Sequence, residues 1–165
     1  MTVQDVKNKL IWDLVLVYGE AQLVRKARFL AELARVLQQK MNPILIGGDF
    51  NIIRKSSEKN KPGSPGHWSF VFNAIIEQSN MIEFPLNGGQ YTWGNHLEHP
   101  TFEKLDRVLC CTNWEENYPL ASVEALYREK SNHVPLFICS GDLPRFDPPF
   151  KFENAWLERE RGLIN

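Results

Sequence analysis

The pattern within residues 12–46 constrains the fold most strongly. Two apolar runs there flank one segment with an amphipathic helical repeat. Residues 12–18 form an apolar run that ends at Gly19, which predicts a mostly buried strand. Residues 43–46 form a second such run, followed by two glycines. Between the runs, residues 22–40 carry a helical repeat whose expected apolar face is Leu23, Ala27, Leu30, Ala34 and Leu37. Strands interleaved with helices indicate an α/β fold.

Shorter elements continue this pattern toward the C-terminus. A second helix is expected over residues 67–80, and further strands over 91–93, 104–110, 122–126 and 134–139. Residues 51–66 hold prolines, glycines and many charges, so we expect a loop there. Prolines mark residues 142–165 as a linker and tail, which leaves residues 1–141 as the expected domain.

Composition limits the class of protein and the cellular compartment that we expect. Of the 165 residues, 43% are hydrophobic and 24% are charged, which is typical of an ordered globular domain. No apolar run is long enough to span a bilayer, and residues 1–9 lack the apolar stretch of a signal peptide. The three cysteines show no CxxC spacing, so they favour small buried residues over a disulfide framework or a zinc site. We expect a nuclear or cytoplasmic protein that is not secreted and does not contact a membrane.

Any contact with nucleic acid requires a local basic patch, because the net charge of the chain is −1. The best candidate is the loop at residues 54–61, with Arg54, Lys55 and Lys61 as its predicted contacts. The alternative is that this segment is only a solvated loop, and charge alone favours that interpretation.

Asp49 and Asn51 are the first candidate site residues. They follow a buried strand and two glycines, which can let a ligand approach the backbone. Because they are two residues apart, an extended segment would point both side chains the same way. A carboxylate and an amide suit a hard cation and a phosphate oxygen. The alternative is a plain turn in which both side chains bond their own backbone.

Asp106 and His133 are the second candidate pair. Asp106 lies within an otherwise apolar strand, so its carboxylate requires a partner. His133 precedes another apolar strand. A bond from Asp106 to one ring nitrogen of His133 would leave the other nitrogen free for proton transfer. The alternatives are that Arg107 or a backbone donor satisfies Asp106, and that His133 is structural.

Five short motifs occur in a fixed order along the chain. They are Val17-Tyr18-Gly19, Gly48-Asp49-Phe50-Asn51, Tyr91-Thr92-Trp93-Gly94-Asn95, Lys104-Leu105-Asp106-Arg107 and Ser131-Asn132-His133. Their order resembles that of endonuclease/exonuclease/phosphatase domains, and the motifs at 91–95 and 104–107 look most like plant LINE-type (non-LTR) retrotransposon endonucleases. The tail at 149–157 is similar to the segment that leads toward a reverse transcriptase in those polyproteins. The resemblance implies part of a four-layer α/β sandwich of the DNase I type.

The resemblance also implies roles for individual residues. Asp49 would position and activate the attacking water, and Asn51 would help to orient it. Tyr18 would donate a hydrogen bond to the scissile phosphate. His133, oriented by Asp106, would bond a phosphate oxygen or pass a proton. The implied cofactor is Mg²⁺ or Mn²⁺, and the implied partner is DNA, with Trp93 and Asn95 as further contacts.

Two departures from the family pattern weaken the implied site. The family domain begins with strands that carry an asparagine and a metal-binding glutamate, and we expect this chain to correspond only to the C-terminal half. The family usually has Ser-Asp-His where this chain has Ser131-Asn132-His133, so Asn132 would be at most a weak or outer metal ligand. We therefore expect weak cation binding, and an exposed sheet face that favours self-association.

Three functions stay open at this point. The first is a truncated metal-dependent DNA endonuclease, derived from a LINE-type retrotransposon, with weak or no activity alone. The second is a non-catalytic retroelement remnant that at most binds nucleic acid weakly. The third is a phosphatase that acts on a small phosphorylated molecule, and the motifs at 91–95 and 104–107 argue against it.

Overall fold

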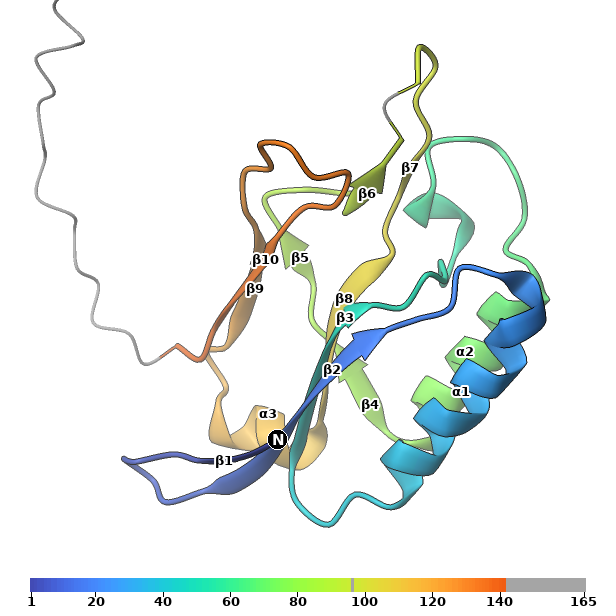
Figure 1. The fold of residues 1–165 in the computed structure, drawn as a ribbon. Coiled ribbons are helices and arrows are strands. Elements are labelled where there is room, and N and C mark those ends of the chain that lie inside the picture. Colours follow the sequence, from blue (N-terminus) through green and yellow to red (C-terminus); the bar gives the residue numbers. More distant parts are fainter. Residues whose placement is uncertain (96, 142–165) are drawn as a thin grey trace, which may run out of the picture.

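The computed structural model describes residues 1–95 and 97–141, and the expected linker and tail at 142–165 lie outside these described residues. The elements in chain order are β1 (Thr2–Gln4), β2 (Ile11–Tyr18), α1 (Leu23–Gln38), β3 (Ile44–Asp49), η1 (Ser56–Glu58), α2 (His67–Gln78), β4 (Met81–Glu83), β5 (Leu86–Asn87), β6 (Trp93–Gly94), β7 (Phe102–Glu103), β8 (Asp106–Cys111), α3 (Thr112–Asn117), β9 (Ser122–Ala125) and β10 (Leu136–Cys139). Figure 1 shows the mixed α/β fold that these elements form, as the alternation of strands and helices predicts.

A five-stranded sheet in the order β1-β2-β3-β8-β4 forms the centre of the fold. Strands β2 and β3 are parallel, so the chain must cross over between them, and α1 makes this crossover. Strand β8 runs antiparallel to both β3 and β4. Helix α2 packs beside α1, and the two helices cover one face of the sheet (Figure 1).

A second sheet, in the order β10-β9-β5, lies on the side of the central sheet away from α1 and α2 (Figure 1). Trp12 and Leu14 of β2 and Ile138 of β10 line a cleft of about 340 Å³ between the two sheets. Strands β6 and β7 form a separate hairpin. The described residues thus form a layer of helices, a sheet and a second sheet, which is part of the expected sandwich.

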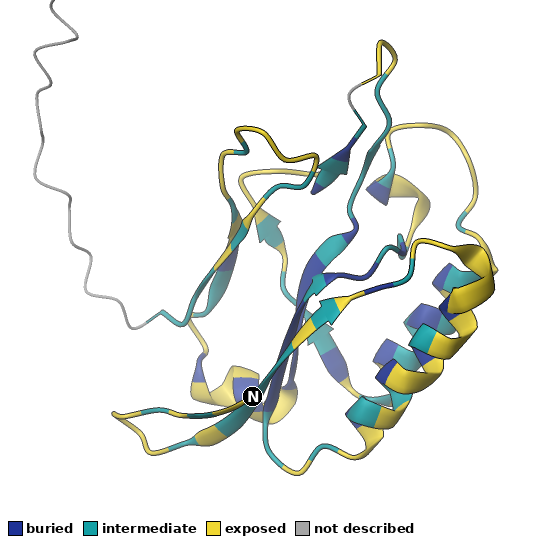
Figure 2. Ribbon diagram, in the orientation of Figure 1, coloured by how far each residue is buried: buried dark blue, intermediate teal, exposed yellow. Residues whose placement is uncertain are grey.

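The main core lies between the two helices and the central sheet, where Figure 2 shows the buried residues concentrated. Helix α2 contributes Phe72 and Ile76 from the apolar stripe that its sequence predicts. Strand β8 is buried along almost its whole length, and Cys110 and Cys111 are small buried residues within it. Burial raises the pKa of the Cys110 thiol to about 12.

The apolar face expected for α1 is confirmed at Leu30 and Leu37 and is wrong at the start of the helix. Leu23 is 67% exposed and Ala27 is also exposed, whereas the buried residues of this helix are Lys26, Leu30, Leu33 and Leu37. The buried face begins with a lysine because a long aliphatic stem can lie in the core while its ammonium group reaches a polar partner. A hydropathy pattern assigns such a residue to the solvent side.

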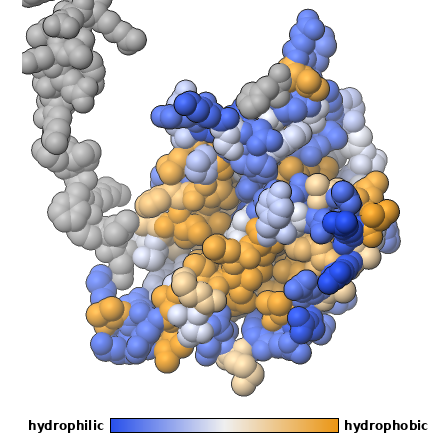
Figure 3. Space-filling view, viewed as in Figure 1, coloured by the Kyte–Doolittle hydropathy of each residue, from blue (hydrophilic) through white to orange (hydrophobic). Residues whose placement is uncertain are grey.

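Part of the face between the sheets is open to solvent. Leu16 of β2, on the same face as Trp12 and Leu14, is 81% exposed. Phe137 of β10, on the opposite face of its strand from Ile138, is 42% exposed. Figure 3 shows apolar side chains gathered over β2 and over the β9–β10 hairpin. This is the kind of surface that self-association uses, and self-association through it stays a prediction. Within residues 1–95 and 97–141, no helix has the length and apolar character needed to cross a membrane.

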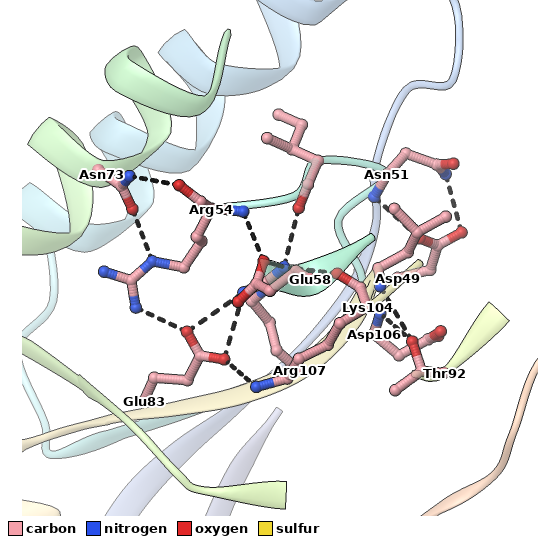
Figure 4. Close-up of polar contacts among 12 residues, drawn as sticks. Asp49, Asn51, Arg54, Glu58, Asn73, Glu83, Thr92, Lys104, Asp106 and Arg107 are labelled. Atoms are coloured by element: carbon pink, nitrogen blue, oxygen red, sulfur yellow. Dashed lines mark hydrogen bonds and ion pairs between the residues drawn. The ribbon is translucent and has the colours of Figure 1, made fainter. Parts of the chain in front are cut away.

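A buried charge network lies between β8 and the helices (Figure 4). The Arg107 guanidinium forms ion pairs with Glu58 and Glu83, each at 3.2 Å. Glu83 also accepts hydrogen bonds from Lys104 at 2.5 Å and from Arg54 at 2.6 Å. Burial acts to raise the pKa of the Glu83 carboxyl, but these three cations outweigh it and hold that pKa at about 2.

We predict that Glu83→Gln destabilises the protein in a pH-dependent way. A carboxyl whose folded-state pKa lies below its ordinary value of 4.5 contributes stability above pH 4.5 and loses it as the pH falls toward 2. At neutral pH the variant should lose on the order of 2 to 3 kcal/mol of unfolding free energy, and the difference should shrink in acid. Urea denaturation across this pH range measures the effect. Glu77→Gln, at an exposed glutamate beside the same network, is the matched control. A loss that is constant over the whole range would contradict the prediction.

Candidate active site

Three neighbouring strands bring candidate residues to one end of the central sheet. Tyr18 ends β2, Asp49 ends β3 and Asp106 begins β8. Tyr18 pairs with Asp49, and Asp49 pairs with Asp106, in the register of the sheet. Because directly paired residues point to the same face, all three side chains lie on the face away from the helices. Tyr18 is 86% exposed, so its phenol is open to solvent.

A turn, rather than an extended segment, joins Asp49 to Asn51. Asn51 has a φ of 51°, in the left-handed region that asparagine tolerates. Its backbone N–H donates to Asp49 Oδ1 and its side-chain amide donates to Asp49 Oδ2, both at 2.8 Å. The two side chains therefore meet as expected, but the extended geometry expected for them is wrong. The backbone bond is the one that the plain-turn alternative describes.

The glycines beside the site make room for neighbouring backbone. Gly48 has a φ of 138°, and a Cβ there would lie 2.1 Å from the carbonyl oxygen of Val17. A Cβ on Gly19 would lie 2.4 Å from the carbonyl oxygen of Phe50. The expectation that glycine at Gly48 admits a ligand is therefore corrected, since the space belongs to strand β2.

His133 completes the cluster by contacting both acids. Its Nδ1 lies 2.9 Å from Asp106 Oδ2, and its Nε2 lies 3.9 Å from Asp49 Oδ2. The second distance is too long for a hydrogen bond, so Nε2 is free to face a ligand oxygen. Arg107 points to the helix side of β8 (Figure 4), so the alternative in which Arg107 satisfies Asp106 is wrong.

Thr92 positions the segments that carry Asp106 and His133. Its side chain is fully buried, and its hydroxyl accepts the backbone N–H groups of Leu105 and Asp106 at 3.0 and 2.9 Å. Its carbonyl accepts the Val134 N–H at 2.7 Å. The sequence identified Thr92 only as part of a motif, although a threonine between two aromatic residues is a usable signal for a buried hydroxyl.

Burial is the main cause that raises the pKa of the Asp49 carboxyl, and the negative charge of Asp106 adds to it. The hydrogen bonds from Asn51 and the nearby His133 lower this pKa only in part. A carboxyl with a raised pKa is a better proton acceptor when it is ionised. Lys26, which the sequence did not indicate, is only 7% exposed, and its ammonium group donates to the Asn51 carbonyl.

Asp49, Asp106 and His133 could together hold a metal ion. Each offers one ligand atom, and these atoms lie within 4.8 Å of one another. Carboxylate oxygens suit hard divalent cations such as Mg²⁺ and Mn²⁺, whereas imidazole suits softer metals. The donor set therefore fits a divalent cation, with few oxygen ligands for one that prefers an octahedral oxygen shell.

Asn132 lies next to His133 with an exposed side chain. Its backbone carbonyl accepts hydrogen bonds from the Gly94 N–H and from Arg128 Nη1, both at 3.0 Å. The part of the chain that the structure describes provides no hydrogen-bond partner for its side-chain amide. The position is thus fixed by its backbone, and metal coordination by Asn132 stays a prediction.

The residues of the predicted basic patch lie in different environments in the structure. Arg54 is half-buried and is engaged by Glu83 at 2.6 Å, so its guanidinium belongs to the charge network. Lys55 and Lys61 are exposed, and Lys61 donates to the His99 carbonyl at 3.2 Å. The Arg54 guanidinium is therefore already engaged by a carboxylate while the two lysines are exposed, and contact of all three residues with nucleic acid stays a prediction.

Trp93 lies beside the site, and Asn95 follows it two residues later along the chain. Trp93 forms an isolated antiparallel bridge with His133. The Asn95 side-chain oxygen accepts the Thr101 N–H at 2.7 Å, which joins the residue after β6 to the residue before β7. Their contact with DNA stays a prediction.

Comparisons with known proteins agree with this arrangement. The model of the endonuclease/exonuclease/phosphatase family matches residues 3–133, so the chain belongs to this family. Family membership supports a nuclease-type or phosphatase-type hydrolase, and the family generally depends on a divalent metal. No curated protein sequence matches the chain.

Several solved structures share the fold. The chain is similar to the endonuclease domain of TRAS1, a telomere-specific non-LTR retrotransposon, with 12% identity and a TM-score of 0.60 over 83% of the chain. It is similar to the 3'-5' exonuclease NExo from Neisseria meningitidis, with 16% identity and a TM-score of 0.61 over 78% of the chain. An AP endonuclease from Archaeoglobus fulgidus has 13% identity and a TM-score of 0.62 over 84% of the chain. At these identities the likeness shows a DNase I-like fold. The chain spans 60% of the length of each of the first two structures and 69% of the third.

We predict that the stability of Asp49→Asn relative to the wild type increases as the pH rises from acid to neutral. A carboxyl whose folded-state pKa is raised disfavours the folded state once it ionises, and asparagine does not ionise. Because asparagine also loses one of the two hydrogen bonds from Asn51, the change of the stability difference with pH, and not its sign, reports the ionisation of Asp49. Urea denaturation at neutral and acid pH measures this change, with Glu129→Gln, at an exposed carboxylate, as the control. A stability difference that stays constant, or that falls as the pH rises, would sink the idea.

Proposed function

We propose that this chain is a metal-dependent phosphodiesterase domain that acts on DNA, of the LINE-type retrotransposon kind, with weak or no activity by itself. The observation that carries the proposal is the cluster of Asp49, Asp106 and His133 at the end of the central sheet. Similarity to the fold of the TRAS1 endonuclease domain supports the retrotransposon origin. A nuclear or cytoplasmic location, and correspondence to the C-terminal half of such a domain, stay predictions.

Phosphodiester hydrolysis needs an activated water, charge neutralisation at the phosphate and a stabilised leaving group. In this proposal Asp49 orients a water molecule and accepts its proton, while Asn51 holds Asp49 in place. The Tyr18 phenol donates a hydrogen bond to a phosphate oxygen. A divalent cation, when bound at the cluster, supplies Lewis-acid stabilisation of the phosphate charge.

His133 has a proton-dependent role in this scheme. When its Nδ1–H donates to Asp106, Nε2 accepts a proton in the neutral ring and donates to a phosphate oxygen in the protonated ring. Because Asp106 accepts from Nδ1, it keeps the ring oriented toward Asp49 in both states. This arrangement supports general acid–base chemistry at Nε2.

Two features support weak activity. The cluster provides only two carboxylates for a hard cation, and Asn132 adds no charge beside His133. Loss of a single group that stabilises the transition state commonly lowers the rate by about a hundredfold or more. The same features favour the second candidate, a non-catalytic remnant that binds nucleic acid weakly.

Nicking of supercoiled plasmid by the purified chain, in Mg²⁺ and in chelator, tests the proposal. We expect slow nicking that requires the metal and that falls at least about a hundredfold in Asp49→Ala and in His133→Ala. Glu116→Ala, at an exposed carboxylate on α3, is the matched control and should nick like the wild type.

The other outcomes separate the alternatives. Absence of nicking by a sample that is shown to be folded supports the remnant. Hydrolysis of a small phosphomonoester without plasmid nicking supports the phosphatase. Nicking that persists in both Asp49→Ala and His133→Ala contradicts the assigned site.

We also predict that Asn132→Asp strengthens Mg²⁺ binding, so that nicking requires less Mg²⁺. A carboxylate beside His133 adds negative charge near the cluster, which favours cation binding. The Mg²⁺ concentration for half-maximal nicking should fall by up to about tenfold. Asn113→Asp adds the same charge on α3 and is the control. An unchanged Mg²⁺ requirement in Asn132→Asp would contradict a role for this position at the metal.

A further inference from the structure

Buried cations from two different elements bind the successive carbonyl groups of Asn51 and Ile52. Lys26 of α1 is 7% exposed, and its Nζ donates to the Asn51 carbonyl. Arg107 of β8 is 1% exposed, and its Nη2 donates to the Ile52 carbonyl at 2.9 Å. Hydrogen bonds from charged donors are stronger than those between neutral groups. The segment that leaves β3 is therefore held at two adjacent points.

Arg107 also binds the backbone just before Asp106, the second acid of the site. The same Nη2 donates to the Lys104 carbonyl at 2.7 Å, just before Asp106 enters β8 (Figure 4). The Phe50 N–H donates to the Leu105 carbonyl at 3.0 Å, which joins the same two segments directly. One guanidinium thus connects the segment after Asp49 with the segment before Asp106.

The surroundings of Arg107 keep its guanidinium in one orientation. Glu58 and Glu83 each contact it at 3.2 Å, and its central carbon lies 5.6 Å from the centre of the Phe72 ring. The Glu58 carboxylate also accepts the Arg54 backbone N–H at 2.6 Å. A planar fork fixed in this way directs its remaining donors, which a flexible ammonium group would not do.

Asn51 needs support from outside its own turn. A φ of 51° is uncommon for a residue other than glycine, and such a conformation persists when surrounding contacts determine it. The Asn51 side-chain amide bridges Asp49 Oδ2 and the Gly19 carbonyl, at 2.8 and 2.9 Å. A shift of the turn would break this bridge and release the Asp49 carboxylate.

We propose that Lys26 and Arg107 are positioning residues that hold Asn51 against Asp49, and Asp106 opposite Asp49, through backbone carbonyls. Neither cation belongs to the cluster of Asp49, Asp106 and His133. The effect on reaction rate rests on the proposed function, whereas the effect on the turn rests on these contacts alone.

Amide hydrogen exchange followed by NMR tests the proposal without any need for activity. Lys26→Met removes the charge but keeps the stem, and Arg107→Lys keeps the charge but loses the fork. In each variant, exchange of the Asn51 N–H, which bonds Asp49 Oδ1, should accelerate by about tenfold or more. The Ile46 amide in the middle of β3 reports any loss of global stability, so the acceleration at Asn51 should clearly exceed the acceleration at Ile46. Lys40→Met is the matched control, because Lys40 donates to the Ser79 carbonyl at 3.0 Å in another part of the molecule.

Plasmid nicking in Mg²⁺ provides the second measurement. Both variants should lower kcat by about tenfold with little change in the KM for plasmid. Lys26→Arg, which restores a charged donor, should recover most of the rate.

Failure of the proposed function and failure of the positioning role give different results in the two measurements. A wild-type chain that does not nick ends the proposed function, and exchange at Asn51 still decides the positioning role. Exchange at Asn51 within about twofold of wild type in both variants overturns that role. Equal acceleration at Ile46 indicates general unfolding and overturns it as well.

Discussion

The pairing of β3 with β8 is the contact on which both the fold and the candidate site depend. It sets Asp49 directly opposite Asp106, where two negative charges repel each other. The protein offsets the repulsion by giving each carboxylate its own donor. Asn51 donates to Asp49, and a ring nitrogen of His133 lies against Asp106. The cluster is thus held together by a partner on each acid, and its three ligand atoms lie within 4.8 Å of one another.

Strand β8 carries functionally different side chains on its two faces. Asp106 faces the side away from the helices, where His133 contacts it, while the fully buried side chain of Arg107 faces the helices in a largely buried charge network. Successive residues of a strand point to opposite faces, so this division needs only two adjacent positions. Cations on the helix side can therefore bond the backbone without lying among Asp49, Asp106 and His133.

Local patterns in the sequence predicted the main strands, both long helices and the meeting of Asp49 with Asn51. They did not predict the burial of Lys26, because a charged residue on a helix is assigned to solvent unless its distant partner is known. They placed Arg54 in a basic patch, since nothing nearby in sequence indicates its ion pair with Glu83. The shortest strands, such as β5 and β7, contain too few residues to show any periodicity. What the sequence missed is therefore mostly long-range and electrostatic.

Two adjacent free cysteines, Cys110 and Cys111, end strand β8, and the burial of Cys110 can be used to follow the opening of this strand. The Cys110 thiol is fully buried, and burial raises its pKa to about 12, so almost no thiolate exists near neutral pH. Alkylating reagents and oxidants attack the thiolate, so they can react with Cys110 only when the strand leaves the sheet. The same strand carries Asp106. The rate at which this thiol is labelled therefore measures how often the strand opens, and so how often the structure beneath the site unfolds locally.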